Sequence, residues 1–162
     1  MRAVVLADTH VRTGSAHPLP ERVYDALAGA DVILHAGDVV SQDLLDDLAR
    51  YAPVHAVLGN NDVELAGLLP ETRVVDLDGV QVAMIHDSGA RAGRAGRLRR
   101  RFPRADAVVF GHSHQPVNES GIDGQLLFNP GSPTQRRMAP TRTIGVLEAR
   151  RGRLLRAELI DV

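Results

Sequence analysis

The chain has 162 residues, a formal net charge of −1, and 44% hydrophobic and 24% charged residues. This length and balance predict one soluble domain, residues 1–162, and exclude an intrinsically disordered chain. The absence of cysteine excludes disulfides, thiolate metal sites and cysteine nucleophiles. Aromatic residues make up only 3% of the chain, so a base-stacking surface for single-stranded nucleic acid is not expected. The near-zero net charge gives no basic surface for duplex DNA.

The sequence predicts no membrane contact. No run approaches the roughly 20 apolar residues of a membrane-spanning helix. The chain passes from Met1 and Arg2 into a short apolar run that ends at Asp8, whereas a signal peptide needs a longer apolar region and a small-residue cleavage site. We therefore expect a cytoplasmic protein.

In the first half of the chain, short apolar runs alternate with helical patterns. Strands are expected at residues 3–7, 31–35 and 54–58, and helices at residues 19–29 and 42–51. Pro20 and Gly29 are typical of the start and end of a helix, and Ser41 is a candidate N-cap. Strands that alternate with helices imply right-handed βαβ units and a parallel sheet.

In the second half, the pattern changes to hairpins. Three turns separate paired apolar runs, and they lie at Asp78-Gly79, residues 121–124 and Arg151-Gly152. The paired strands are expected at residues 72–77 and 80–85, 117–120 and 125–128, and 143–149 and 154–160. An arginine-rich helix with a solvated face is expected at 91–102, followed by a buried strand at 105–110. Together these elements predict an α/β fold of four layers, an αββα sandwich of two mixed sheets flanked by helices.

Five expected strands are followed directly by side chains that can bind metal ions. These side chains are Asp8 and His10, Asp38, Asn60 and Asp62, His86, and His112 and His114. Open α/β sheets bind ligands at the carboxyl ends of their strands, so these side chains are expected to meet in one crevice. Carboxylates, imidazoles and an amide oxygen suit divalent ions such as Mn²⁺, Fe²⁺, Zn²⁺ or Ni²⁺. The two ions of a dinuclear site share ligands, and Asp38 is the expected bridge.

Several residues near these ligands have a structural interpretation. We expect sharp backbone turns at the glycines before three of the ligands, which are Gly37, Gly59 and Gly111. Asp62 could orient an imidazole or a bound hydroxide, or it could cap a turn. Three further histidines are expected to be structural or surface residues, namely His17, His35 and His55.

Five motifs occur in a fixed order, Asp8-x-His10, Gly37-Asp38, Gly59-Asn60-x-Asp62, His86 and Gly111-His112-x-His114. This series resembles the calcineurin-like metallophosphoesterases, and Leu19-Pro20 and Asn129-Pro130-Gly131-Ser132 resemble their small YfcE-type phosphodiesterase branch. The resemblance implies the αββα fold and two divalent ions per chain, with Mn²⁺ as the first expectation and Fe, Zn or Ni as alternatives. It places one ion on Asp8, His10, Asp38 and His114, and the other on Asp38, Asn60, His86 and His112.

The resemblance also implies an activity, that of a metal-dependent phosphodiesterase. A hydroxide that bridges the two ions would attack phosphorus in line, and the expected catalytic residues are Asp38, Asn60, Asp62 and His112. Many family members have a histidine in place of Asn61, and that histidine is thought to protonate the leaving group. Because asparagine cannot donate that proton, we expect substrates whose leaving group is good, strained or metal-bound.

Three residues are candidates for binding the substrate, and these are Asn61, Ser132 and Arg136. The backbone amides of residues 129–132 could line the cleft, and Arg136 and Arg137 could then meet a phosphate. An exposed basic loop is the alternative interpretation.

Two other functions stay open. A retromer subunit of the same fold acts mainly by binding partners, and the loss of metal ligands would mark that path. A nuclease would need a positively charged groove beside the cleft. The expected partner is a small-molecule phosphodiester, nucleic acid is not expected, and a homo-oligomer, either a dimer or a tetramer, is left open.

Overall fold

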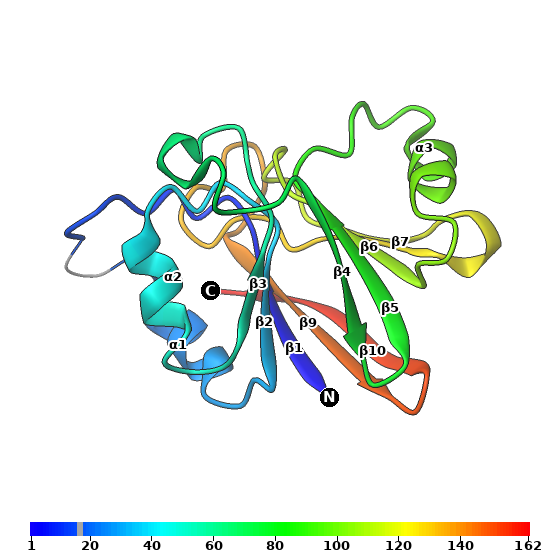
Figure 1. The fold of residues 1–162 in the computed structure, drawn as a ribbon, viewed down its shortest axis with the longest axis horizontal. Helices are drawn as coiled ribbons and strands as arrows, with labels where there is room; N and C mark the ends of the chain where they lie inside the picture. The colour runs from blue at the N-terminus through cyan, green and yellow to red at the C-terminus, as the bar shows by residue number, and fades with distance from the viewer. Residues whose placement is uncertain (16–17) are drawn as a thin grey trace.

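Two mixed β-sheets of five strands each form the centre of the protein (Figure 1). The structure is a computed structural model and describes residues 1–15 and 18–162. The expectation for His17 therefore lies outside the described residues. No helix of the described chain is both long enough and apolar enough to cross a bilayer.

The first sheet contains the βαβ units that the sequence predicts. Its strand order is β10-β9-β1-β2-β3, and the first three strands in the chain, β1 (Arg2–Leu6), β2 (Val32–His35) and β3 (Val54–Ala56), are parallel. The helices α1 (Glu21–Leu27) and α2 (Gln42–Leu48) connect them. The hairpin of β9 (Thr143–Arg150) and β10 (Arg153–Asp161) joins the sheet antiparallel to β1.

The second sheet has the strand order β4-β5-β6-β8-β7. Its central strands are parallel, and they are β5 (Val80–Ile85), β6 (Ala107–Val109) and β8 (Leu126–Asn129). The edge strands β4 (Thr72–Leu77) and β7 (Val117–Ser120) run antiparallel to their neighbours. The helix α3 (Arg94–Arg101) lies between β5 and β6 in sequence, and short 3₁₀ turns occur at Val63–Leu65 and Ile122–Gly124.

Three apolar clusters hold the four layers together. Side chains such as Leu34, Val82 and Phe128 fill the space between the two sheets. A second cluster packs α1 and α2 onto the outer face of the first sheet, and a third packs Leu98 of α3 against Phe110. Figure 1 shows α1 and α2 on one flank of the molecule and α3 on the other. The predicted αββα sandwich of two mixed sheets is thus confirmed.

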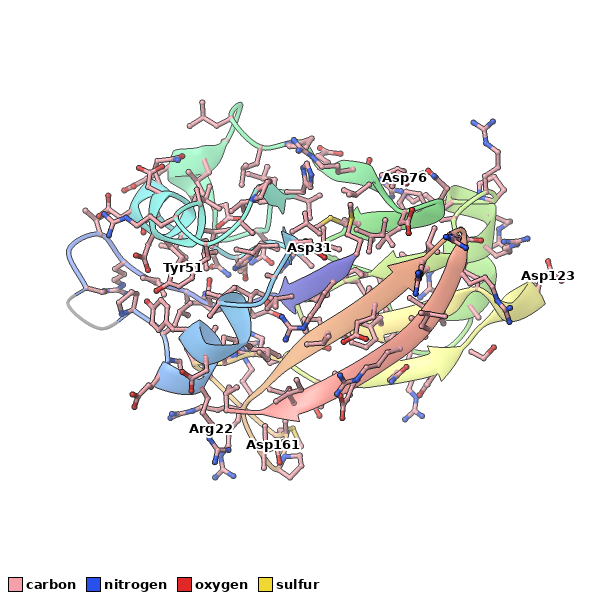
Figure 2. All side chains as sticks on the ribbon, turned by 90° about the horizontal axis from the view of Figure 1, so that it is seen from below. Arg22, Asp31, Tyr51, Asp76, Asp123 and Asp161 are labelled. Atoms are coloured by element: carbon pink, nitrogen blue, oxygen red, sulfur yellow. The ribbon has the colours of Figure 1, made fainter. Side chains whose placement is uncertain are left out.

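Two hairpin tips connect the sheets at the end of the molecule where the chain starts. Asp78 and Gly79 have φ of +51° and +89°, and Arg151 and Gly152 have φ of +49° and +74°, as expected for two-residue turns with left-handed backbone. The Asp78 side chain accepts a hydrogen bond from the Arg151 amide at 2.9 Å. Figure 2 shows the third turn, at Asp123, at the far end of the molecule from Tyr51.

The local predictions differ from the structure mainly at helix ends. All three helices are shorter than predicted. Pro20 stands before the first helical residue of α1, the last residues of the α1 and α2 patterns form turns, and the first residues of the α3 pattern form a bend and a turn. Ser41 occupies the N-cap position of α2 but makes no capping hydrogen bond. Its hydroxyl is buried without a partner, so the predicted capping interaction is wrong.

Candidate metal centre

The loops that follow β1, β2, β3, β5 and β6 carry the predicted ligands and lie at one edge of the two sheets. Backbone hydrogen bonds join the first two of these loops. The Asp8 amide donates to the Gly37 carbonyl at 3.0 Å, and the His10 amide donates to the Asp38 carbonyl at 3.0 Å. All seven predicted ligands are brought together there, in two neighbouring clusters.

The first cluster contains Asp8, His10 and His114. Each offers one ligand atom, and these atoms all lie within 4.8 Å of one another. The His10 and His114 Nε2 atoms are 3.2 Å apart, and His114 Nε2 is 3.5 Å from Asp8 Oδ1. His114 Nδ1 lies 2.7 Å from the Gln135 carbonyl. Because a carbonyl can only accept, Nδ1 carries the proton, and the Nε2 lone pair faces the cluster.

The second cluster contains Asn60, His86 and His112. The Asn60 Oδ1 atom is 3.0 Å from His86 Nε2 and 2.9 Å from His112 Nδ1. His86 is held in the same way as His114, since its Nδ1 lies 2.8 Å from the Ala36 carbonyl. Its Nε2 lone pair therefore points into the cluster as well.

Asp38 lies between the two clusters, and each of its oxygens faces a different one. Its Oδ2 is 3.6 Å from His10 Nε2, and its Oδ1 is 3.5 Å from His86 Nε2. This is the placement that a shared carboxylate needs. Asp8 also forms a group with Asp38 and His86 in which the ligand atoms lie within 4.8 Å of one another, so its carboxylate is close to both clusters rather than to one.

The donor set fits divalent cations. Asp8 is fully buried, and its Oδ2 has no hydrogen-bond partner. Desolvation and the charge of Asp38 raise the pKa of Asp8 to about 8, so the carboxylate needs a proton or a cation to stay buried. Burial lowers the pKa of His10 and of His114. Both imidazoles are therefore neutral near neutral pH, the form that binds metal.

Asn61 is tied to the shared carboxylate. Its amide N–H donates to Asp38 Oδ1 at 2.8 Å, and its Nδ2 donates to Asp38 Oδ2 at 2.6 Å. Burial opposes ionisation of Asp38, but the hydrogen bonds from Asn61 and the nearby imidazoles outweigh it, so the pKa of Asp38 lies below its usual value. Asn61 is exposed at the site, and the structure gives it a role in holding Asp38.

Asp62 makes the contacts of a residue that holds loops. Its carboxylate accepts hydrogen bonds from the backbone amides of Asp38 at 3.0 Å, Val40 at 2.7 Å and Gly59 at 2.7 Å. Among the described residues it bonds to no imidazole. Of the two interpretations of Asp62, the geometry favours the turn-capping one, and the expected catalytic role gains no support.

The three glycines before the ligands act in two different ways. Gly37 has φ of +89°, which agrees with the predicted sharp turn. Gly59 and Gly111 also begin tight turns, closed by the Asp62 and Ser113 amides, but they have no positive φ. A Cβ at Gly59 would lie 2.1 Å from the Asp38 amide nitrogen, and one at Gly111 would lie 2.9 Å from the Ala7 Cβ. The ligand loops approach too closely there to admit a side chain.

The backbone is strained at the candidate centre. Ten non-glycine residues of the described chain have positive φ, and three of them precede a glycine in a turn between strands. Five of the others are candidate ligands, which are Asp8, His10, Asp38, His112 and His114. Left-handed backbone at non-glycine residues costs about 1–3 kcal/mol each and persists at sites where the surroundings enforce it.

In the loop after β8, two residues predicted to bind the substrate make contacts within the protein. The Ser132 hydroxyl is buried and donates to the Asp8 carbonyl at 2.8 Å. Arg136 donates to the Pro140 carbonyl at 3.1 Å within its own loop. The neighbouring Arg137, in contrast, lies beside the centre, where its Nη1 is 3.5 Å from the His112 carbonyl. The sequence signalled both arginines, but it could not tell which one faces the site.

Two histidines have the structural roles that the sequence predicts. His35 is fully buried, with its Nε2 at 3.0 Å from the Thr9 hydroxyl, and burial lowers its pKa to about 3. His55 lies on β3, with its Nδ1 at 3.0 Å from an Arg73 nitrogen. Neither side chain belongs to the two clusters.

A cleft of about 380 Å³ adjoins the second cluster. Its walls include Asn60, His86 and His112, together with the apolar residues Leu58 and Ile85. Charged residues also line it, namely Glu71, Asp87 and Arg101. The cleft connects the second cluster to solvent.

Comparison with known proteins identifies the family. The model of the calcineurin-like phosphoesterase superfamily domain matches residues 1–152. The chain belongs to this superfamily. A "Probable metallophosphoesterase" of Methanothermobacter thermautotrophicus is 37% identical over 136 residues, which are 83% of this chain and 78% of that protein.

Solved structures share the fold of this calcineurin-like phosphoesterase domain. The E. coli phosphoesterase YfcE has a TM-score of 0.66 and 23% identity over 98% of both chains. Wild-type Vps29 of Entamoeba histolytica, solved in complex with Zn²⁺, has a TM-score of 0.76 and 23% identity over 100% of this chain and 99% of that one. The resemblance inferred from the five motifs is confirmed, and with it a metal-dependent hydrolase family.

Proposed function

We propose that the protein is a dinuclear metal-dependent phosphodiesterase. The observation that carries this proposal is the placement of Asp38, whose two carboxylate oxygens face the two clusters at 3.6 Å and 3.5 Å. Such a carboxylate can serve two ions at once. The orphaned Oδ2 of Asp8 adds a second acceptor that a cation would satisfy.

Each ion would have its own set of protein ligands. One set is Asp8, His10, Asp38 and His114, and the other is Asp38, Asn60, His86 and His112. Two divalent ions, Mn²⁺ first among Fe, Zn and Ni, would supply Lewis acidity and lower the pKa of a bound water. The protein's own part is to hold the ligands in place, since Gln135 and Ala36 fix the two buried imidazoles and Asn61 fixes Asp38.

The donors at the site favour diesters with a good or strained leaving group. Asn61 holds Asp38 through its Nδ2 and cannot supply the proton that an alkoxide leaving group needs. The leaving group of the substrate must therefore be a weak base, or its departure must be helped by the opening of a strained ring.

A protein-interaction scaffold of the same fold is the other candidate. That function does not need a complete metal site, yet every expected ligand side chain is present and the ligand atoms converge. A nuclease is a variant of the enzyme proposal. It would need a basic groove, and the adjoining cleft carries both acidic and basic residues.

The test compares two substrates on purified protein with and without Mn²⁺. We expect metal-dependent hydrolysis, faster for a nitrophenyl diester than for the nitrophenyl monoester. A preference for the monoester would overturn the diester assignment, and no metal-dependent hydrolysis of either would favour the scaffold.

A second variant tests the leaving-group argument. Asn61→His should gain activity on diesters with poor leaving groups, because general acid catalysis typically contributes about 10²–10⁴-fold. If the variant folds, binds metal and gains nothing on these esters, the missing acid does not limit the enzyme.

A further inference from the structure

The loop after β8 is fixed to the candidate centre at three successive points. The Ser132 hydroxyl donates to the Asp8 carbonyl at 2.8 Å, and the Thr134 hydroxyl donates to the Thr9 carbonyl at 2.8 Å. The Gln135 carbonyl accepts from His114 Nδ1 at 2.7 Å. The loop is thus held by two ligand-bearing segments, and the position of the residues that follow is set by the centre itself.

This loop places the Arg137 side chain beside the candidate centre. Its Nη1 lies 3.5 Å from the carbonyl of His112, an exposed ligand of the second cluster. The residue has φ of +48° in a turn that the Ala139 amide closes by donating to the Arg136 carbonyl at 2.8 Å.

Toward the other described residues, the guanidinium of Arg137 keeps most of its hydrogen-bond donors free. In the described part of the chain, the ion pairs made by arginines do not include Arg137. A guanidinium has five N–H donors, and the His112 carbonyl uses only one of them.

A cation placed next to a metal site without a carboxylate partner is suited to an anion. Guanidinium binds phosphate oxygens bidentately, with planar geometry and permanent charge. We propose that Arg137, and not Arg136, binds the non-bridging oxygens of the substrate phosphate. This assignment rests on the proposed function, because it takes the two clusters to be the place where the phosphate lies.

Arg136 provides a matched control. It has the same charge and lies one position away, but its guanidinium donates to the Pro140 carbonyl at 3.1 Å. Any effect of net charge or of loop composition should appear equally in Arg136→Gln and Arg137→Gln. An effect of direct phosphate binding should appear only in Arg137→Gln.

The experiment measures calorimetric binding of inorganic phosphate to the metal-loaded wild type and to both variants, with the metal content of each verified. We expect Arg137→Gln to bind phosphate about tenfold more weakly or worse, and to raise KM for the nitrophenyl diester by a similar factor. Arg136→Gln should match the wild type, and Arg137→Lys should recover part of the loss.

Three results would overturn the assignment. They are equal phosphate affinity in Arg137→Gln and the wild type, equal weakening in both glutamine variants, and loss of metal from Arg137→Gln that reloading does not restore. Phosphate binding that depends on Arg137, in a protein that hydrolyses no diester, would support the assignment while refuting the proposed activity.

Discussion

The two buried ligand imidazoles each use one ring nitrogen for the protein and leave the other for the centre. His114 Nδ1 lies 2.7 Å from the Gln135 carbonyl, and His86 Nδ1 lies 2.8 Å from the Ala36 carbonyl. These contacts fix the tautomer and the ring orientation before any ion binds. Such outer contacts typically change metal affinity by about 10–100-fold when they are removed. At the scale of single residues, the centre is therefore organised by backbone carbonyls.

The first prediction concerns Asp38. Asp38→Asn removes the carboxylate whose oxygens face both clusters, so both ions should bind at least about tenfold more weakly, and turnover should fall with them. Titration with Mn²⁺ followed by elemental analysis measures this. Asp87→Asn is the control, because Asp87 lines the cleft beside the second cluster but belongs to neither ligand set. Unchanged occupancy in Asp38→Asn would refute the shared role.

The second prediction concerns His35 and pH. Burial lowers the pKa of His35 to about 3 from its usual 6.5, so the folded state binds this proton less tightly than the unfolded state. The contribution of neutral His35 to the free energy of unfolding is complete above pH 6.5 and is lost as the pH falls toward 3. His35→Gln should therefore lose stability less steeply with acid, by up to about 1.4 kcal/mol per pH unit.

Urea unfolding of the metal-free proteins across that pH range measures the difference. His10 and His114 titrate in both proteins, so the comparison isolates His35. His55→Gln should show a smaller change because His55 is only partly buried. Parallel curves for His35→Gln and the wild type would contradict the prediction.

At the scale of elements, the strands bring the ligand-bearing loops to one edge of the sheets, and contacts between the loops position the ligands. The loops after β2 and β3 are joined by one side chain, because Asp62 accepts hydrogen bonds from the amides of Asp38, Val40 and Gly59. The positions of two ligands, Asp38 and Asn60, therefore depend on Asp62. All of these hydrogen bonds are made to backbone amides and none to a ligand side chain.

The third prediction follows from this arrangement. Asp62→Asn keeps the size of the side chain but turns one acceptor into a donor that meets a backbone N–H. We expect the free energy of unfolding to fall by about 2–4 kcal/mol and metal binding to weaken. Asp46→Asn, on the exposed part of α2, should cost far less. Equal unfolding curves for the two variants would show that Asp62 does not hold the loops.

The sequence predicts strands and hairpins well because each carries a local signal. Asp78-Gly79 adopts the left-handed turn that its residue types favour, and Gly152 allows the same turn after Arg151. The positions of the seven ligands also follow from local signals, since each comes at the end of an apolar run. Ser41 shows the limit, because the choice between a capping hydroxyl and a buried one depends on packing rather than on residue type.

The remaining errors concern contacts between segments far apart in the sequence. Ser132 turns inward to the Asp8 carbonyl, and Arg137 rather than Arg136 reaches His112. Both facts depend on how the loop after β8 docks on the loop after β1. The close approach of Gly59 to Asp38 is of the same kind. The residue spacing within one segment does not predict this close approach.

At the scale of the whole molecule, the two sheets together make one centre. The loops of the first sheet supply Asp8, His10, Asp38 and Asn60, and those of the second supply His86, His112 and His114. Each ion would be bound by ligands from both sheets and would therefore link the two sheets. Metal binding should therefore be linked to global stability.

The fourth prediction tests this link. Ions bound at a hundredfold excess over Kd stabilise the native state by about 2.7 kcal/mol per site. Metal removal should also leave buried, unpartnered oxygen at Asp8. Chelation should lower Tm by about 5–10 °C for each site that it empties in a chain of this size. Identical melting curves with and without chelator, after verified metal removal, would refute a site of useful affinity.

The most direct test of the central claim follows turnover as metal-free protein is titrated with Mn²⁺. The measurement records bound metal and the rate of nitrophenyl diester hydrolysis at each step. If two ions act together through Asp38, activity should stay low until the first site is filled and should then rise to its maximum at two bound ions per chain. Full activity at one bound ion, or two bound ions without hydrolysis, would contradict the account.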